Sequence, residues 1–136
     1  MDDMKRGASA ADSKGEGCVL VVNDDTALLI AMKFVVKGMG VPVVTADSVE
    51  GAMEERRKSN VTLIISDIDF GRGKMTGYDF LQLIRKEDHC VPFYLMSGSS
   101  QEDEGQKAFA MGANGYIQLP AEASCVEKIF KENHIL

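Results

Sequence analysis

Residues 18–25 read CVLVVNDD and residues 61–67 read VTLIISD, so an apolar run ends in carboxylates at two places in the chain. Both runs are short, continuous and rich in β-branched residues, as in the buried strands of a parallel sheet. A helical pattern follows each run, which places both strands in one such sheet. Because the carboxyl ends of parallel strands share one edge, Asp24, Asp25 and Asp67 are predicted to meet in one crevice. Carboxylates gathered in this way repel one another unless a hard cation or a phosphoryl group takes part, which indicates chemistry rather than packing.

The rest of the chain repeats this alternation of strand and helix. Strands are predicted at 18–22, 41–46, 61–66, 91–96 and 115–119, and helices at 26–36, 49–58, 77–87, 101–111 and 121–132. Right-handed crossovers between parallel strands place helices on both faces of the sheet. The prediction is therefore an α/β fold with a five-stranded, doubly wound parallel sheet of order 2-1-3-4-5. The acidic crevice lies between the ends of strands one and three.

Length and composition indicate one folded domain. The chain has 136 residues, of which 45% are hydrophobic and 26% are charged, so it can fill one core. Residues 1–17 are rich in small and polar residues without an apolar period, which predicts a flexible tail before a folded domain at 18–136. The formal net charge of −6 argues against direct nucleic-acid binding, which needs clustered Lys and Arg.

The cysteines, and the lack of a membrane-spanning or secretory segment, indicate the cellular compartment. No apolar stretch is long enough to span a bilayer, and the N-terminus lacks the apolar core of a secretory signal. Cys18, Cys90 and Cys125 lie far apart and resemble neither a zinc nor a disulfide framework. The sequence predicts a cytoplasmic protein without membrane insertion, and the nucleus is also open if the host is eukaryotic.

The residue types of the crevice suit phosphoryl chemistry. An acidic pair after strand one can hold Mg²⁺, which prefers carboxylates, carbonyls and water. A carboxylate after strand three can complete the metal site and attack phosphorus, forming an acyl phosphate, while Mg²⁺ offsets charge on the transferring group. Asp24 can alternatively cap the following helix. The hydroxyl of Ser97, after strand four, can contact a phosphoryl oxygen, but Ser97 also suits a turn or a helix cap.

On these residues the chain resembles a response regulator receiver domain, the CheY-like, flavodoxin-like phospho-acceptor module of two-component signalling. The resemblance covers residues 18–136. It implies that Asp67 is the phospho-acceptor and that Asp24, Asp25 and Asp67 hold Mg²⁺. It also implies that the backbone carbonyl of Asp69 is a metal ligand.

The resemblance extends to the fourth and fifth strands, with one departure. Ser97 in Met-Ser-Gly and Tyr116 in Gly-Tyr-Ile match the family's switch residues, although Tyr116 equally suits a partly buried strand position. Leu119 stands where the family has a lysine that pairs with the acceptor and the phosphoryl group. A leucine has neither charge nor donor, and it also suits core packing. Pro120 matches a proline that follows a cis bond in the family.

The loop after the acceptor is a second departure. The family has a Gly eight residues after the acceptor, whereas Gly77 comes two residues later, and Arg72 and Lys74 lie in the inserted loop. We hypothesise that Lys74 or Arg72 reaches the acidic crevice and partly replaces the missing cation. The alternative is a solvated loop with ordinary surface charges.

These residues are compatible with two functions. The first is a stand-alone receiver that accepts a phosphoryl group from a histidine kinase or a histidine phosphotransfer protein and signals to a downstream protein target. Such a module is not an enzyme, although it assists its own phosphorylation and dephosphorylation. The second is a pseudo-receiver, a protein-binding module without productive phosphorylation, which the leucine and the altered loop favour. A metal-dependent phosphatase is more distant, because the chain shows no acid/base residue and no cap for a substrate.

Overall fold

The computed structural model describes residues 15–98 and 102–136, in which strands and helices alternate. The strands are β1 (Gly17–Val22), β2 (Val43–Ala46), β3 (Asn60–Asp67), β4 (Phe93–Ser97) and β5 (Gly115–Gln118), and the helices are α2 (Thr26–Gly38), α3 (Val49–Lys58), α4 (Gly77–Glu87), α5 (Glu102–Ala110) and α6 (Ala123–Glu132). Neighbouring strands are parallel, in the order β2-β1-β3-β4-β5. The predicted sheet order is therefore confirmed.

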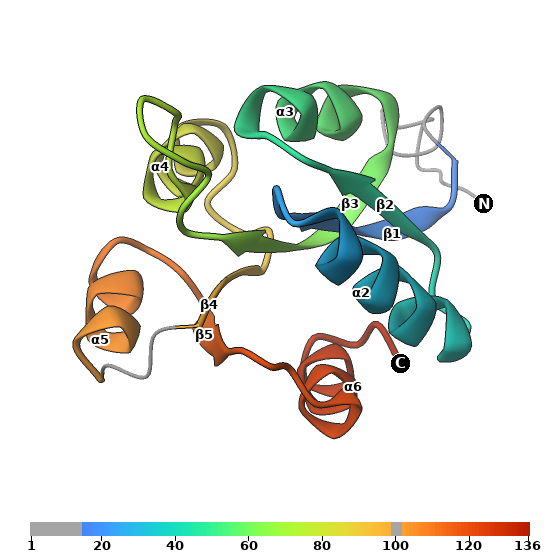
Figure 1. Ribbon diagram of the computed structural model, residues 1–136. Coiled ribbons are helices and arrows are strands. Elements are labelled where there is room, and N and C mark those ends of the chain that lie inside the picture. The colour runs from blue at the N-terminus through green and yellow to red at the C-terminus, as the bar shows by residue number, and fades with distance from the viewer. Residues whose placement is uncertain (1–14, 99–101) are drawn as a thin grey trace.

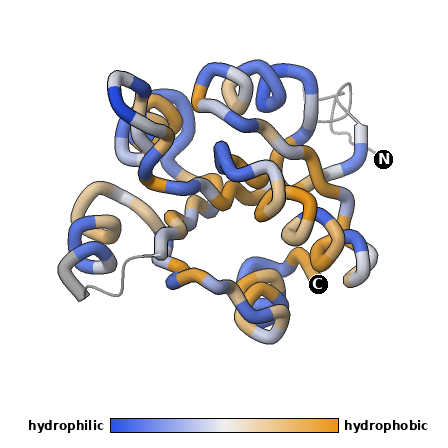
Figure 2. The backbone as a smooth tube through the Cα atoms, in the orientation of Figure 1, coloured by the Kyte–Doolittle hydropathy of each residue, from blue (hydrophilic) through white to orange (hydrophobic). Residues whose placement is uncertain are grey.

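Helices cover both faces of the sheet, as Figure 1 shows. Successive strand residues point to opposite faces, so Val19 and Val21 pack against α2 and α6, whereas Leu20 and Val22 pack against α3, α4 and α5. All four of these residues are fully buried, because neither face is open to water. Figure 2 shows the result as a band of hydrophobic residues along the strands.

Strands β2 and β4 each begin two residues later than predicted, and proline is the common cause. Pro42 and Pro92 directly precede these strands and have no N–H to donate to a ladder. The N–H groups one residue earlier are also engaged elsewhere. Val41 donates to the carboxyl end of α2, and Val91 donates to the side chain of Asp88.

The remaining boundaries lie close to the prediction. Helices α3 and α4 have the predicted bounds, and α2 continues to Gly38 because the turn that ends it comes at Met39 and Gly40. Gly17 already belongs to β1, so the folded part begins one residue before the predicted boundary. Most of the predicted tail lies outside the described residues. Within the described part of the chain, no helix is long and apolar enough to cross a membrane.

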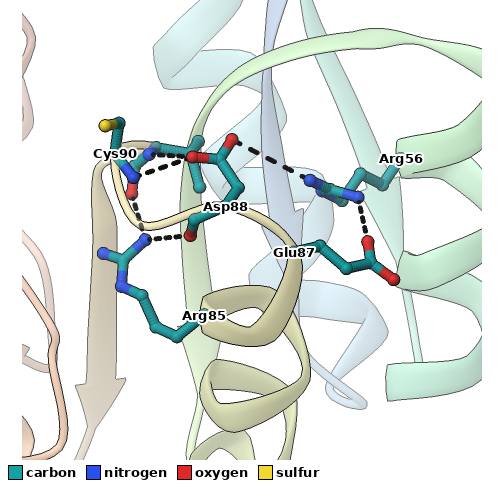
Figure 3. A network of polar contacts seen from close by, with 6 residues as sticks. Arg56, Arg85, Glu87, Asp88 and Cys90 are labelled. Carbon is teal, nitrogen blue, oxygen red and sulfur yellow. Dashed lines mark hydrogen bonds and ion pairs between the residues drawn. The ribbon is translucent and has the colours of Figure 1, made fainter.

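A polar network joins the segments before β4 and β5, at the amino ends of the strands. The guanidinium of Arg85 donates to the carbonyls of Asp88, Val91 and Gly112, at 3.1, 2.8 and 3.0 Å, and to Oδ1 of Asn114 at 3.0 Å. The Asp88 carboxylate accepts the N–H groups of Cys90 and Val91 (Figure 3). Burial raises the pKa of Asp88, but these two bonds and the nearby arginines outweigh it and lower that pKa.

Candidate functional site

The acidic turn after β1 places three adjacent side chains in different surroundings. Asn23 is 2% exposed, and its Oδ1 accepts the N–H of Asp25 at 2.8 Å. Asp25 is the N-cap of α2, where its carboxylate accepts the N–H of Leu28 at 3.2 Å. Asp24 lies between them, exposed to solvent, and its charge acts on Asp67. Asp24 was a candidate for the N-cap of this helix, but Asp25 is the N-cap in the structure.

Asp67 is the last residue of β3 and lies partly buried beside β4, where it pairs in register with Met96. The pKa of Asp67 is raised to about 6, chiefly by burial and to a lesser extent by the charges of Asp24 and Asp69, against the opposing effect of backbone N–H groups. One of those groups is the N–H of Ile68, which donates to Oδ1 at 2.9 Å. The carboxylate is thus mostly ionised at neutral pH and gains from any nearby cation.

The structure places the three predicted carboxylates in different settings. Asp24 and Asp67 are electrostatic neighbours, whereas the carboxylate of Asp25 accepts an N–H group of the helix it caps. Among the described residues, no group of three or more His, Cys, Asp and Glu side chains is placed to hold a metal ion. The role of Asp25 as a metal ligand stays a prediction, because adjacent acids after a strand look alike in sequence and one of them caps the helix.

The oxygen atoms that remain suit a hard cation with few protein ligands. Mg²⁺ usually keeps several waters and takes one or two carboxylates. Asp24 and Asp67 can supply the carboxylates, and the carbonyl of Asp69 is a third oxygen on the same loop. The Asp69 side chain itself is engaged, since its Oδ1 accepts the N–H of Gly71 at 2.9 Å. The raised pKa of Asp67 is a second sign of fit, because burial and the charges of Asp24 and Asp69 both disfavour the ionised carboxylate, and a bound cation would offset both effects.

Gly77 closes the loop that follows Asp67. Its N–H donates to the carbonyl of Ile68 at 2.8 Å, and a Cβ built at this position would lie 2.2 Å from the carbonyl oxygen of Asp67. No side chain fits in that space, so glycine is required for α4 to start against the end of β3. Thr76 caps the helix through a capping box with Asp79. The two inserted residues therefore enlarge the loop without moving this contact away from Asp67.

A cavity of about 390 Å³ lies beside the site, and Asp24 and Lys74 both line it. The other described residues in its wall are Asp47, Ser48, Val49, Glu50, Phe70 and Met75. Lys74 thus reaches the neighbourhood of the acidic crevice, whereas Arg72 is exposed and is not among the described residues of the wall. Whether Lys74 replaces the missing cation stays a prediction.

The predicted switch residues lie on adjacent strands. Ser97 ends β4, and its carbonyl accepts the N–H of Leu119 at 2.8 Å. Tyr116 is partly buried and packs against the core cluster on the α3, α4 and α5 face. Leu119 packs instead against the cluster on the α2 and α6 face, and the Leu119–Pro120 bond is cis, as the resemblance implied. Ser99 and Ser100, which suit the same turn or helix cap as Ser97 in the sequence, lie outside the described residues.

Tyr78 is a residue of this region that sequence reasoning missed. Its hydroxyl donates to the Glu104 carboxylate on α5, and the Lys107 ammonium lies 4.4 Å from the centre of its ring. Burial, followed by the bond to Glu104, raises the pKa of Tyr78 well above its usual value. Tyr78 directly follows Gly77, so the start of α4 contacts both the acceptor strand and α5. In sequence, nothing marks Tyr78 as a partner of Glu104, because the contact joins two helices that are far apart along the chain.

The geometry agrees with comparisons to known proteins. Residues 19–131 match the family model described as the response regulator receiver domain. The chain belongs to this family. The cell cycle transcriptional regulator CtrA of Caulobacter vibrioides is 31% identical over 102 residues, which are 75% of this chain and 43% of CtrA. The response regulator protein FleR of Pseudomonas aeruginosa is 33% identical over 105 residues, 77% of this chain and 22% of FleR. This receiver domain spans less than half the length of these relatives.

Solved receiver structures share the fold. The chemotaxis response regulator CheY4 of Vibrio cholerae matches with a TM-score of 0.76 and 23% identity, over 86% of this chain and 98% of that one. The receiver domain of NtrX from Brucella abortus matches with a TM-score of 0.78 and 21% identity, over 85% and 96%. At such low identity these likenesses speak for the fold alone, and they confirm the predicted CheY-like architecture.

Proposed function

We propose that this receiver domain accepts a phosphoryl group on Asp67 from a phosphohistidine of a histidine kinase or a histidine phosphotransfer protein. The observation that carries the proposal is a partly buried carboxylate at the end of β3, with its pKa raised to about 6 beside Asp24, in a chain of the receiver family. A partly buried carboxylate with a raised pKa is still mostly ionised at neutral pH, so it has an electron pair for attack on phosphorus. Added positive charge nearby would strongly stabilise its ionised form.

The transfer is a displacement at phosphorus. A carboxylate oxygen of Asp67 attacks the phosphorus atom, a P–O bond forms, and the N–P bond to the donor imidazole breaks. The electron pair of that bond stays on the imidazole nitrogen, which takes a proton from solvent. Asp24, Asp67 and the Asp69 carbonyl would hold Mg²⁺, whose charge stabilises the negative oxygen atoms during transfer. The hydroxyl of Ser97 would then donate to a phosphoryl oxygen.

The consequence of phosphorylation would be a changed protein-binding surface rather than a turnover reaction. Ser97 and Tyr116 lie at the end of β4 and on β5, next to α5, and Tyr116 packs on the α5 face of the sheet. A rearrangement there would alter what a downstream protein target contacts. The chain would act as a phosphoryl acceptor in two-component signalling and assist its own phosphorylation and dephosphorylation.

One observation favours a second candidate, a pseudo-receiver that binds proteins without productive phosphorylation. Leu119 lies in an apolar cluster with residues of α2 and α6, so the end of β5 brings no positive charge to the crevice. The retained carboxylates argue the other way. An acidic pair without a ligand lowers stability through repulsion, and the charge of Asp24 contributes, after burial, to the raised pKa of Asp67.

Incubation with acetyl phosphate and Mg²⁺, followed by intact-mass measurement, separates the two functions. We expect the mass to rise by one phosphoryl group and the rise to vanish in Asp67→Asn. Asp69→Asn is the matched control, because an asparagine can still accept the N–H of Gly71 and the carbonyl of residue 69 is unchanged. A chain that gains no mass, even with a phosphorylated phosphotransfer protein as donor, would be a pseudo-receiver.

A further inference from the structure

The carboxyl end of the sheet carries more negative than positive charge. Asp24, Asp67 and Asp69 lie there, and their repulsion contributes to the raised pKa of Asp67. Leu119, at the end of β5, is apolar and packs into the core. A phosphoryl group on Asp67 would carry about two negative charges near neutral pH, in place of the single charge of the carboxylate. One divalent cation does not balance this sum, so a nearby protein cation would stabilise the phosphorylated state.

The cavity beside Asp24 contains a candidate for that charge. Among the described residues of its wall, Lys74 is the one cation, and Asp24, Asp47 and Glu50 are acidic. Lys74 is exposed and forms no ion pair with a carboxylate of the described residues, so its ammonium is not committed to a fixed partner there. An ammonium on a flexible stem can move toward an anion that forms nearby.

The loop is built to hold Lys74 at this place. Phe70 is 7% exposed and fixes the start of the inserted segment in the core. The N–H of Lys74 then donates to the carbonyl of Gly71 at 3.2 Å, in a tight turn where Gly71 and Gly73 have φ values of 108° and 77°. Such values suit glycine, and they return the chain toward the cavity. Arg72, at the exposed tip, is not among the described residues that line the cavity.

We infer that Lys74 is the cation that offsets the charge of the phosphoryl group on Asp67. This inference rests on the proposed function. Lys74 takes no proton and makes no bond in the transfer. It stabilises the developing charge through space, and it does so from the loop after β3 rather than from the end of β5. The two inserted residues are thereby explained, because they lengthen the loop enough to bring a lysine to the wall shared with Asp24.

The test compares Lys74→Gln with Arg72→Gln, which removes an equal charge from the same loop outside the cavity. We expect Lys74→Gln to slow phosphorylation by acetyl phosphate about tenfold, and Arg72→Gln to change it less than about twofold. Lys74→Arg should keep most of the wild-type rate, because it keeps the charge. The difference between the two glutamine variants should shrink at high ionic strength, since exposed charges are then screened.

Magnesium affinity gives a readout that does not depend on phosphorylation. Lys74 repels a bound cation, so Lys74→Gln should tighten Mg²⁺ binding by about two- to fivefold while it slows transfer. A loop that merely lost its structure would weaken both. Calorimetric titration of the unphosphorylated chain with MgCl₂ measures this affinity, and Arg72→Gln is again the reference.

The possible failures are distinct. If the wild-type chain is phosphorylated and the two glutamine variants behave alike, the role of Lys74 is overturned and the proposed function stands. If Lys74→Gln weakens Mg²⁺ binding together with phosphorylation, the lysine has a structural role only. If the wild-type chain accepts no phosphoryl group from any donor, the proposed function fails, and with it this role of Lys74.

Discussion

The two ends of the parallel sheet use polar residues in opposite ways. At the amino ends of β4 and β5, Arg85 binds three carbonyls and a side-chain amide, and Asp88 accepts two backbone N–H groups (Figure 3). At the carboxyl ends of β1 and β3, Asp24 and Asp67 repel each other. The surroundings at the amino ends lower the pKa of Asp88, whereas the surroundings at the carboxyl ends raise the pKa of Asp67.

This difference separates stability from function within one fold. Partnered polar groups such as those of Arg85 stabilise the turns that start the strands. A partly buried charge without a counter-ion, such as Asp67, reduces stability until a ligand binds, which is the expected cost of a site prepared for a cation. Substitutions at the two ends should therefore have different effects on folding and on phosphorylation.

The largest effect is expected at Gly77, which contributes both to the stability of the fold and to the position of Asp67. Gly77→Ala would place a methyl group 2.2 Å from the Asp67 carbonyl oxygen and 2.9 Å from a methyl group of Leu95, so the start of α4 must move. We expect a loss of about 3 kcal/mol in the free energy of unfolding, measured by urea denaturation. Phosphorylation should fall as well. Gly38→Ala is the control, because no heavy atom lies within 4 Å of the added Cβ.

At the amino ends of the strands, stability should change alone. Arg85→Ala removes four hydrogen bonds, two of them to the carbonyls of Asp88 and Val91 in partly buried positions, which should cost about 2 to 3 kcal/mol. The folded fraction should still accept phosphoryl groups at the wild-type rate. Arg57→Ala, which removes an exposed i,i+3 pair with Glu54, should cost less than about 0.5 kcal/mol. A phosphorylation defect in Arg85→Ala would show that the two ends are coupled.

These two ends also differ in how far the sequence could predict them. The strands and helices followed from apolar patterns, because both faces of a parallel sheet must be buried, and the strand order followed from the right-handed crossovers between them. The position of Asp67 at the end of a buried strand followed from the same apolar pattern. The hydrogen bonds of Arg85 could not be predicted, because most of their acceptors are backbone carbonyls, which every residue has and which therefore leave no mark in the sequence. The contact of Tyr78 with Glu104 joins two helices whose relative position only the fold determines.

At the carboxyl ends, the charge of Asp67 should reduce stability in a pH-dependent way. Its pKa is about 6 in the folded chain against an ordinary 3.8, so the native state holds its proton more tightly than the unfolded state does. Stability should therefore fall as the pH rises from about 4 to about 6. Asp67→Asn lacks this loss and should be more stable at pH 7, by about 1 to 2 kcal/mol once partial exposure is allowed for.

Urea denaturation without divalent ions, at pH 7 and at pH 4, measures this difference. The advantage of Asp67→Asn should nearly disappear at the lower pH, where the wild-type carboxyl group is neutral in the folded state. Added Mg²⁺ should also reduce it at pH 7, because the ion stabilises the state that binds it. An Asp67→Asn chain that is less stable than wild type at pH 7 would mean that Asp67 is a structural residue, like Asp88.

The smallest effect distinguishes two neighbouring acids that the sequence treated as one pair. Asp25→Ala removes the N-cap of α2 and should cost about 1 kcal/mol, whereas Asp25→Asn should cost little, since asparagine also caps helices. Neither change should alter Mg²⁺ affinity more than about twofold if Asp25 is a cap alone. Asp24→Ala should do the reverse and weaken Mg²⁺ binding with little effect on stability.

Calorimetric titration of the three variants decides between these assignments. If Asp25→Ala weakens Mg²⁺ binding as much as Asp24→Ala does, the cap must open when the metal binds, and the acidic pair predicted from the sequence is the metal site. If only Asp24→Ala weakens Mg²⁺ binding, Asp25 remains the N-cap of α2 and does not bind the metal. The metal then depends on Asp24, Asp67 and backbone or water oxygen atoms, which makes the nearby charge of Lys74 more important to the site.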